Sequence, residues 1–245
     1  MICDEEKIFG RNTVSEALKS GTEIDKIYVK KEADGSLLPI LKKARAAKIP
    51  ISEVDKRKLD QMTSGENHQG IVAVLPAEHY KTVEEILENA KKKDKPPFVI
   101  ILDKITDAHN LGSIIRTANC VGADGVIIPK HGSVGLNAIA AKTASGAASY
   151  TPVAKVVNIS RTIDDLKKAG LWIIGADMDG EPMYNVDMRG AVGLVIGNEG
   201  EGISRLVREK CDFIAEIPMW GDIDSLNASV AAAVLMYEVK RQQIN

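Results

Sequence analysis

Two apolar runs near the C-terminus, each followed at once by a polar loop, limit most strongly what this chain can fold into. The run LVIG (194–197) leads into the turn NEGEG (198–202), and the run FIAEIP (213–218) leads into a loop rich in Gly, Asp, Ser and Asn. Successive apolar strands joined by a short helix are typical of parallel α/β sheets. Ligands bind outside the carboxyl ends of such strands, so we expect the two loops to form walls of one site.

The last segment, residues 226–239, predicts a helix that is apolar almost all round. One stripe consists of Leu226, Val230, Ala233, Val234 and Tyr237, and the other side carries Ala231, Leu235, Met236 and Val239. A helix with so little polar face has to be covered on both sides. We therefore expect one side to pack on the core of its own domain and the other on a second subunit.

The glycine-rich turn at 197–202 allows two other interpretations. It reads G-x-x-G-x-G, whereas a dinucleotide-binding loop reads G-x-G-x-x-G and opens the first βα unit of its domain. The order of the glycines and their place near the C-terminus disfavour a nicotinamide oxidoreductase. The second interpretation is a tight turn that binds no ligand. These residues alone do not exclude it, because glycine is the usual residue where the backbone needs positive φ.

The composition indicates a soluble protein of the reducing cytosol. No run approaches the ~20 apolar residues that cross a bilayer, and the first ten residues lack the apolar core of a signal peptide. The three cysteines are odd in number and widely separated, and neither they nor the four histidines have zinc-ligand spacing. These residues are Cys3, Cys120, Cys211, His68, His79, His109 and His131. We expect no membrane segment, no disulfide framework and no metal site.

The net charge of −2 gives no general basic excess for binding nucleic acid. Contacts with phosphates would have to come from local groups of basic residues. Two such groups lie in predicted helices: Lys42, Lys43, Arg45 and Lys48, and then Lys56, Arg57 and Lys58. Each group by itself is more often simply the solvated face of a helix.

The chain divides into two α/β domains. Residues 1–76 alternate short helices and strands, and residues 77–96 form a short helix with a Lys-rich, Pro-ended tail that is typical of a connector. Residues 97–245 contain strands that are apolar throughout, such as VIIL (99–102) and VIIP (126–129). We expect this second domain to contain a parallel sheet covered by helices on both faces.

Three polar segments of the second domain each follow a predicted strand: 103–116, 198–200 and 225–229. In the first segment Asn110 can cap a helix. Arg116 lies less than two helical turns further, so it reaches a site only if the start of that helix faces the ligand. Capping is the likelier explanation for any one segment considered alone.

Taken together, the three segments resemble a known family. DKITDAHNLGSIIRTAN (103–119), LVIGNEGEGIS (194–204) and IPMWGDIDSLNASVAAAVLMYE (217–238) are similar, in order and spacing, to the three motifs of the SpoU or TrmH-type RNA 2′-O-ribose methyltransferases. Ala108 stands where many relatives have proline. The resemblance implies S-adenosylmethionine as cofactor, no metal, a homodimer and a C-terminal domain threaded into a deep trefoil knot. Periodicity could not predict such a knot, because threaded chains are rare.

Three further segments resemble the subgroup that methylates a guanosine in 23S ribosomal RNA: FGRNTVSEAL (9–18), HQGIVA (68–73) and IPKHGSVGLNAIAAKTASGA (128–147). This resemblance implies that the N-terminal domain is a small ribosomal-protein-like module that holds RNA. The substrate would be 23S ribosomal RNA, either free or in a ribosome assembly intermediate. A tRNA 2′-O-ribose methyltransferase is one alternative, and a non-catalytic RNA-binding protein with a methyltransferase-like fold is another.

Carried over position by position, the resemblance implies two sets of site residues. The cofactor set is Gly197, Ile217 and Leu226, with backbone groups of Ile196 and Met219. The catalytic or substrate-ordering set is Asn110, Arg116, Glu199, Ser225 and Asn227. A guanidinium stays protonated in proteins, so we expect Arg116 to bind a phosphate and stabilise the developing alkoxide. We expect Glu199 to orient Arg116 or to accept the proton, with a purely structural ion pair as the remaining alternative.

Overall fold

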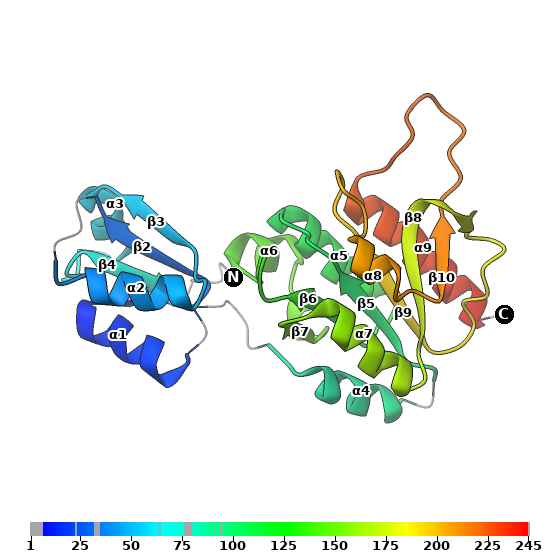
Figure 1. Cartoon of the computed structure of the whole chain (residues 1–245), viewed down its shortest axis with the longest axis horizontal. Helices are drawn as coiled ribbons and strands as arrows, with labels where there is room; N and C mark the ends of the chain where they lie inside the picture. Colours follow the sequence, from blue (N-terminus) through cyan, green and yellow to red (C-terminus); the bar gives the residue numbers. More distant parts are fainter. Residues whose placement is uncertain are drawn as a thin grey trace. The chain divides into compact units, whose positions relative to one another are not determined.

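The structure is a computed structural model, and it describes residues 7–22, 24–31, 35–63, 65–75, 80–93 and 95–244. The chain separates into two units, residues 1–77 and 78–245, each with a sheet of its own (Figure 1). Expectations for Cys3, His79 and the connector residues 77–79 and 94 lie outside the described residues.

The first unit is a four-stranded mixed sheet with helices on it. Its elements are β1 (Lys7–Phe9), α1 (Arg11–Ser20), β2 (Lys26–Lys30), α2 (Leu38–Ala46), β3 (Ile51–Val54), α3 (Lys56–Met62) and β4 (Ile71–Val74). The strand order is β1-β4-β2-β3, with β2 parallel to β3 and β4 antiparallel to both of its neighbours. Ile27 and Val29 of β2 are buried in one core with Val14 of α1 and Leu41 of α2. Alternation along β2 therefore gives this unit its own core.

The second unit contains a six-stranded sheet. Its elements are α4 (Val83–Lys91), β5 (Phe98–Leu102), α5 (Ala108–Cys120), β6 (Gly125–Pro129), α6 (Ala138–Thr143), the 3₁₀ turn η1 (Ala147–Ser149), β7 (Val153–Val156), α7 (Ile159–Lys168), β8 (Trp172–Pro182), β9 (Val192–Ile196), α8 (Arg205–Arg208), β10 (Phe213–Glu216) and α9 (Ala228–Ile244). The strand order is β10-β8-β9-β5-β6-β7, and every pair of neighbours is parallel. The expectation of a parallel α/β domain is confirmed.

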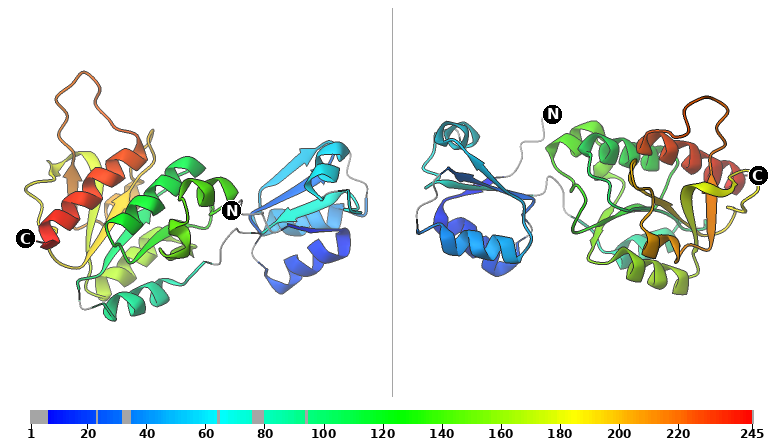
Figure 2. Two further views of the ribbon diagram at one scale, coloured as in Figure 1. Left: turned by 180° about the vertical axis from the view of Figure 1, so that it is seen from behind. Right: turned by 45° about the horizontal axis from the view of Figure 1, so that its top comes forward.

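Helices cover both faces of this sheet (Figures 1 and 2). One core holds Ile100 of β5 together with Leu111 of α5 and Leu235 of α9, and the other holds Val99 of β5 with Ile163 of α7. Successive residues of a strand point to opposite faces. Burial from both sides explains why β5, β6 and β9 are buried at every position.

The strand order reverses at β5, which has β6 and β7 on one side and β9 and β8 on the other. Such a reversal leaves a crevice at the carboxyl ends of the strands, where α/β proteins bind their ligands. The loops that follow β9 and β10 both leave the sheet at this edge, because the two strands run parallel to their neighbours.

The final helix, α9, is covered on one side only in the single chain. Ala232, Leu235 and Met236 are fully buried, whereas Val230 and Tyr237 are 47% and 57% exposed. Among the described residues no helix is long and apolar enough to cross a membrane. The trefoil knot stays a prediction.

Helices α5 and α6 come into close contact at Gly112. A Cβ atom at this position would lie 2.5 Å from the carbonyl oxygen of Ala140 and 2.6 Å from Cβ of Thr143. Only a residue without a side chain allows the two helices to approach so closely. The contact holds α6 and the turn after it against the helix that carries Asn110 and Arg116.

We expect the substitution Gly112→Ala to destabilise the protein. Alanine favours a helix over glycine by about 1 kcal/mol, but overpacking against backbone atoms costs about 1–3 kcal/mol and these atoms cannot rotate away. Gly190→Ala is a matched control, since a Cβ there would meet only Trp172 at 3.9 Å. Denaturant unfolding of both variants measures the difference, and equal stability would contradict the close helix contact.

Candidate functional site

Three polar side chains meet at the carboxyl edge of the second unit's sheet. Asn227 Nδ2 lies 3.1 Å from Asn110 Oδ1 and 3.0 Å from Glu199 Oε1. The amide of Asn110 donates a further hydrogen bond to the same Oε1 atom of Glu199. Asn110 is buried, whereas Glu199 and Asn227 are exposed. The cluster holds one carboxylate between two amides and joins residues up to 117 positions apart.

Asn110 lies in the first turn of α5 and does not cap it. The cap is Asp107, whose Oδ1 accepts a hydrogen bond from the backbone N–H of His109 at 2.7 Å. The expectation that Asn110 caps this helix is therefore wrong. Because Asp107 satisfies the end of the helix, the amide of Asn110 is available to the cluster.

A tight turn after β9 presents Glu199. Asn198 and Gly202 exchange two backbone hydrogen bonds, of 3.1 and 2.9 Å, and Asn198 Oδ1 accepts from the backbone N–H of Gly200 at 2.8 Å. Asn198 Nδ2 also donates to the carbonyl oxygen of Lys104 at 3.1 Å. The side chain of Asn198 thus joins the turn to the loop that follows β5.

The orientation of the Asn227 amide is fixed by the start of α9. Its Oδ1 atom accepts hydrogen bonds from the backbone N–H and the hydroxyl of Ser229, at 3.0 and 2.6 Å. The Nδ2 atom is therefore directed toward Asn110 and Glu199. The amide orientation follows from this network, since an amide's oxygen must be the atom that accepts.

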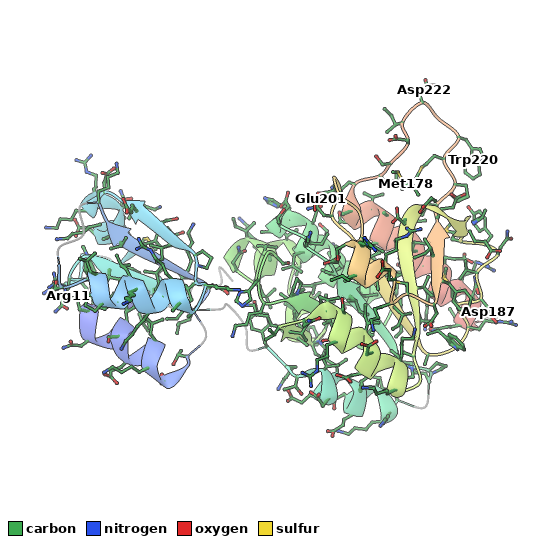
Figure 3. All side chains as sticks on the ribbon, in the orientation of Figure 1. Arg11, Met178, Asp187, Glu201, Trp220 and Asp222 are labelled. Carbon is green, nitrogen blue, oxygen red and sulfur yellow. The ribbon has the colours of Figure 1, made fainter. Side chains whose placement is uncertain are left out.

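A cavity of about 880 Å³ adjoins this cluster through Glu199. Its walls are the middle of β8, the carboxyl ends of β9 and β10 with the loops that follow these two strands, and the first half of α9. The whole cofactor set lines it: Ile196, Gly197, Ile217, Met219 and Leu226. Glu199 and Ser225 of the catalytic set line it as well, whereas Asn110, Arg116 and Asn227 do not. Of the residues labelled in Figure 3, Met178 and Glu201 line the cavity, and Trp220 and Asp222 lie on the loop that follows β10.

The residues of the cavity suit a planar, partly apolar group such as adenine. Apolar side chains on its walls include Ala215, Ile217 and Leu226, and its volume lies in the range of ~300–1,000 Å³ that is usual for small-molecule sites. Gly197 brings backbone close to backbone, because a Cβ there would collide with Gly202 and with the backbone nitrogen of Ile203. A larger residue at 197 would displace the turn that forms one wall.

Arg116 lies apart from the cluster. It is exposed, and its Nη1 atom is 3.5 Å from the hydroxyl of Ser145 in the turn after α6. Ser145 has a φ of +52°, in the left-handed region that few residues other than glycine adopt. Within the described part of the chain no carboxylate pairs with Arg116. The structure therefore brings together Asn110, Glu199 and Asn227, but not Arg116.

The middle of β8 forms a wall that the sequence reasoning missed. Ala176, Asp177 and Met178 line the cavity, and Asp177 pairs with Arg208 of α8, which also contacts Asp179 at 2.8 Å. Burial alone would lower the pKa of the Arg208 guanidinium, but the carboxylates of Asp177 and Asp179 together outweigh it and the pKa is raised. The sequence pattern that could have revealed this wall is the polar run DMDG (177–180) after the apolar run IIGA (173–176).

Among the residues that the structure describes, no group of three or more His, Cys, Asp and Glu side chains could hold a metal ion. The three-residue cluster itself offers one carboxylate and two amides. Such groups can orient a hydroxyl and accept its proton.

Two family models match the two parts of the chain. The model of the SpoU rRNA methylase family matches residues 97–237, and a model for RNA 2′-O ribose methyltransferase substrate binding matches residues 7–81. The first covers the sheet, the cavity and the whole three-residue cluster. The second covers the mixed sheet of the first unit.

Curated relatives and solved structures are similar over nearly the whole chain. TrmH family tRNA/rRNA methyltransferases of Bacillus subtilis and Staphylococcus epidermidis are 44% and 46% identical, and each alignment covers 96% of this chain and 95% of the relative. The SpoU methyltransferase AviRb of Streptomyces viridochromogenes, solved with its cofactor AdoMet, is 25% identical with a TM-score of 0.62 over 98% of this chain and 91% of AviRb. This chain belongs to the SpoU family of RNA methyltransferases.

Proposed function

We propose that this protein transfers a methyl group from S-adenosylmethionine to the 2′-hydroxyl of a ribose in RNA, and that the target is a guanosine of 23S ribosomal RNA. The observation that carries the proposal is the contact of Asn110, Glu199 and Asn227 beside a cavity lined by the family's cofactor positions. Family membership supports the reaction. The likeness of segments 9–18, 68–73 and 128–147 to the guanosine-methylating subgroup supports the target.

The cluster is suited to deprotonating the ribose hydroxyl. When bound, S-adenosylmethionine supplies an electrophilic methyl group, whose bond to sulfur breaks as its bond to the ribose oxygen forms, with the bonding electrons left on sulfur. Glu199 accepts both amide hydrogen bonds at Oε1, and its Oε2 atom has no partner among the described residues. Asn110 and Asn227 thus orient the carboxylate and leave one oxygen to accept the proton.

Arg116 is proposed to bind a phosphate of the RNA next to the target ribose. Its guanidinium is exposed and unpaired with any carboxylate of the described residues. A guanidinium is a hydrogen-bond donor with no acceptor, so it can attract phosphate but cannot serve as a base. Ser225 is exposed at the cavity, where its hydroxyl donates to Asp224 at 3.2 Å. We assign Ser225 to ordering the ribose.

The first unit is proposed to hold the RNA. The substrate-binding family model covers residues 7–81. Two groups of basic residues are exposed there. The first lies on α2 and just after it, and the second lies on α3: Lys42, Lys43, Arg45 and Lys48, then Lys56, Arg57 and Lys58. Their charge can neutralise phosphates although the whole chain is slightly acidic.

We propose a homodimer in the cytosol, with the outer stripe of α9 in the interface. Val230 and Tyr237 are 47% and 57% exposed, and Leu226 just before the helix is 37% exposed. An exposed row of apolar side chains is typical of a protein–protein interface. A second copy of the chain would supply the cover that α9 lacks in the single chain.

The target is tested by comparing ribose methylation in cells with and without this protein. We expect one guanosine of 23S ribosomal RNA to lose its 2′-O-methyl group, and purified protein with S-adenosylmethionine to restore it without added metal. Loss of a tRNA methyl group instead would support the tRNA alternative. Unchanged methylation in both RNA classes would contradict an enzymatic role and favour a non-catalytic RNA-binding protein.

We expect Gly197→Ala to weaken cofactor binding about tenfold or more, which corresponds to at least about 1.4 kcal/mol. The new methyl group would collide with Gly202 and Ile203 and displace the turn at the cavity wall. Gly221→Ala is the matched control, because Gly221 lines the same cavity but has open space where its Cβ would lie. Calorimetric titration with S-adenosylhomocysteine measures both, and equal affinity in the two variants would contradict this role.

Substitutions at Arg116 and Glu199 separate phosphate binding from proton transfer. Arg116→Lys should keep part of the rate because it keeps the charge, and Arg116→Ala should lose ~10²- to 10³-fold, as removal of one charge-stabilising group does. Glu199→Gln should abolish the fall in rate at acid pH that a carboxylate base produces. Single-turnover rates across pH at saturating cofactor give the comparison. Undiminished rates in Arg116→Ala, or an acidic limb that persists in Glu199→Gln, would contradict these roles.

A further inference from the structure

The charged side chains that line the cavity beside Glu199 are all negative among the described residues. Five carboxylates line it, and no Lys, Arg or His side chain does so among the described residues. The five are Asp177, Glu199, Glu201, Glu216 and Asp224. The chain as a whole carries a net charge of only −2, so this concentration of negative charge belongs to the cavity.

Two of the carboxylates are neutralised from outside the cavity. Asp177 pairs with Arg208, and Glu201 lies 3.3 Å from Nζ of Lys104. These two pairs connect the cavity walls to α8 and to the loop after β5. Their net contribution to the charge of the cavity is small.

The other three carboxylates have no cationic partner in the described part of the chain. Glu199 accepts only the two amide hydrogen bonds, and Asp224 accepts one from the Ser225 hydroxyl at 3.2 Å. Glu216, at the carboxyl end of β10, is partly buried and has no side-chain partner among the described residues. Negative charge at these three positions is therefore left for a ligand to balance.

We infer that this uncompensated charge makes the cavity select the positively charged cofactor over its neutral product, with Glu216 and Asp224 as specificity-determining residues. The inference rests on the proposed function. S-adenosylmethionine carries a sulfonium, an ammonium and a carboxylate, for a net charge of +1. S-adenosylhomocysteine has a neutral thioether in place of the sulfonium, and its net charge is zero.

The size of the preference for the charged ligand depends on how far the three carboxylates are exposed to water. Asp224 and Glu199 are exposed and Glu216 is partly buried, so their field acts through a medium closer to water than to a protein interior. At such effective dielectric constants each nearby charge changes affinity about two- to fivefold, and salt screens it over about 8 Å at physiological ionic strength. Together the three carboxylates favour the charged ligand about ten- to a hundredfold at low salt.

The same carboxylates also affect the cofactor product and the RNA substrate. They weaken the hold on the product, which favours its release after transfer. They also repel RNA phosphates from the cavity, so the RNA backbone approaches the cluster from the side of α5 and α6. That side carries Arg116 and the exposed Lys142, neither of which pairs with a carboxylate among the described residues.

The test is calorimetric titration of the full chain with three ligands at low and at high salt. The ligands are S-adenosylmethionine, S-adenosylhomocysteine and sinefungin, in which a positively charged amine replaces the methylated sulfur. We expect both charged ligands to bind about ten- to a hundredfold more tightly than S-adenosylhomocysteine at low salt, with a smaller ratio at high salt. The use of sinefungin separates the effect of charge from that of the methyl group.

Two single variants and a control test whether the cavity carboxylates cause the preference for charged ligands. Glu216→Gln and Asp224→Asn should each lower the ratio about two- to fivefold and leave S-adenosylhomocysteine affinity nearly unchanged. Glu209→Gln makes the same charge change outside the cavity, on a carboxylate that pairs with Arg205 at 2.8 Å, and should not alter the ratio. Thermal unfolding checks that all variants are folded.

The outcomes distinguish this inference from the function on which it rests. Equal affinity for charged and neutral ligands, or a ratio that neither cavity variant changes, would overturn the charge selection and leave the methyltransferase proposal standing. Failure of all three ligands to bind the wild-type protein would overturn the proposed function and the inference together.

Discussion

The close approach of Gly197 to Gly202 is the constraint on which the candidate site depends. The chain folds back on itself here so tightly that a Cβ at position 197 would collide with the carbonyl carbon of Gly202. The turn that results has Glu199 near its tip and forms a wall of the cavity. One backbone contact therefore fixes both the carboxylate that is proposed to accept the proton and the space that is proposed to hold the cofactor.

The loop after β5 is held to the same turn by a buried carboxylate. Asp103 is 5% exposed; its backbone N–H donates to Ile196 at 2.9 Å, and its Oδ2 accepts from the backbone N–H of Ser204 at 2.7 Å. A buried carboxylate is costly unless it is hydrogen-bonded. Here it joins two neighbouring strand ends, which holds the start of α5, and hence Asn110, in place against the turn that carries Glu199.

The architecture could be predicted from local pattern, but the assembly of the site could not. Uniformly apolar strands require cover on both faces, so the parallel sheet and its two loops followed from the order of apolar runs and polar segments along the chain. Arg116 shows where the prediction of the site from sequence fails. Six residues after Asn110 correspond to a rotation of about 600°, or about 240° beyond a full turn, so the two side chains leave α5 in different directions. Asp107 was missed as the cap because Asn110 is an equally good capping residue in sequence. The roles of the site residues came from family resemblance.

The distance along the chain between Asn110 and Asn227 has a consequence for how the protein is made. The two amides are 117 residues apart, and Asn227 precedes the last helix. Contacts of such long sequence separation form late, because a large loop must close before they are gained. During synthesis the chain emerges from the N-terminus at about 5–20 residues per second. The first unit, which is proposed to hold RNA, is therefore synthesised well before the carboxylate of Glu199 can have both of its amide partners.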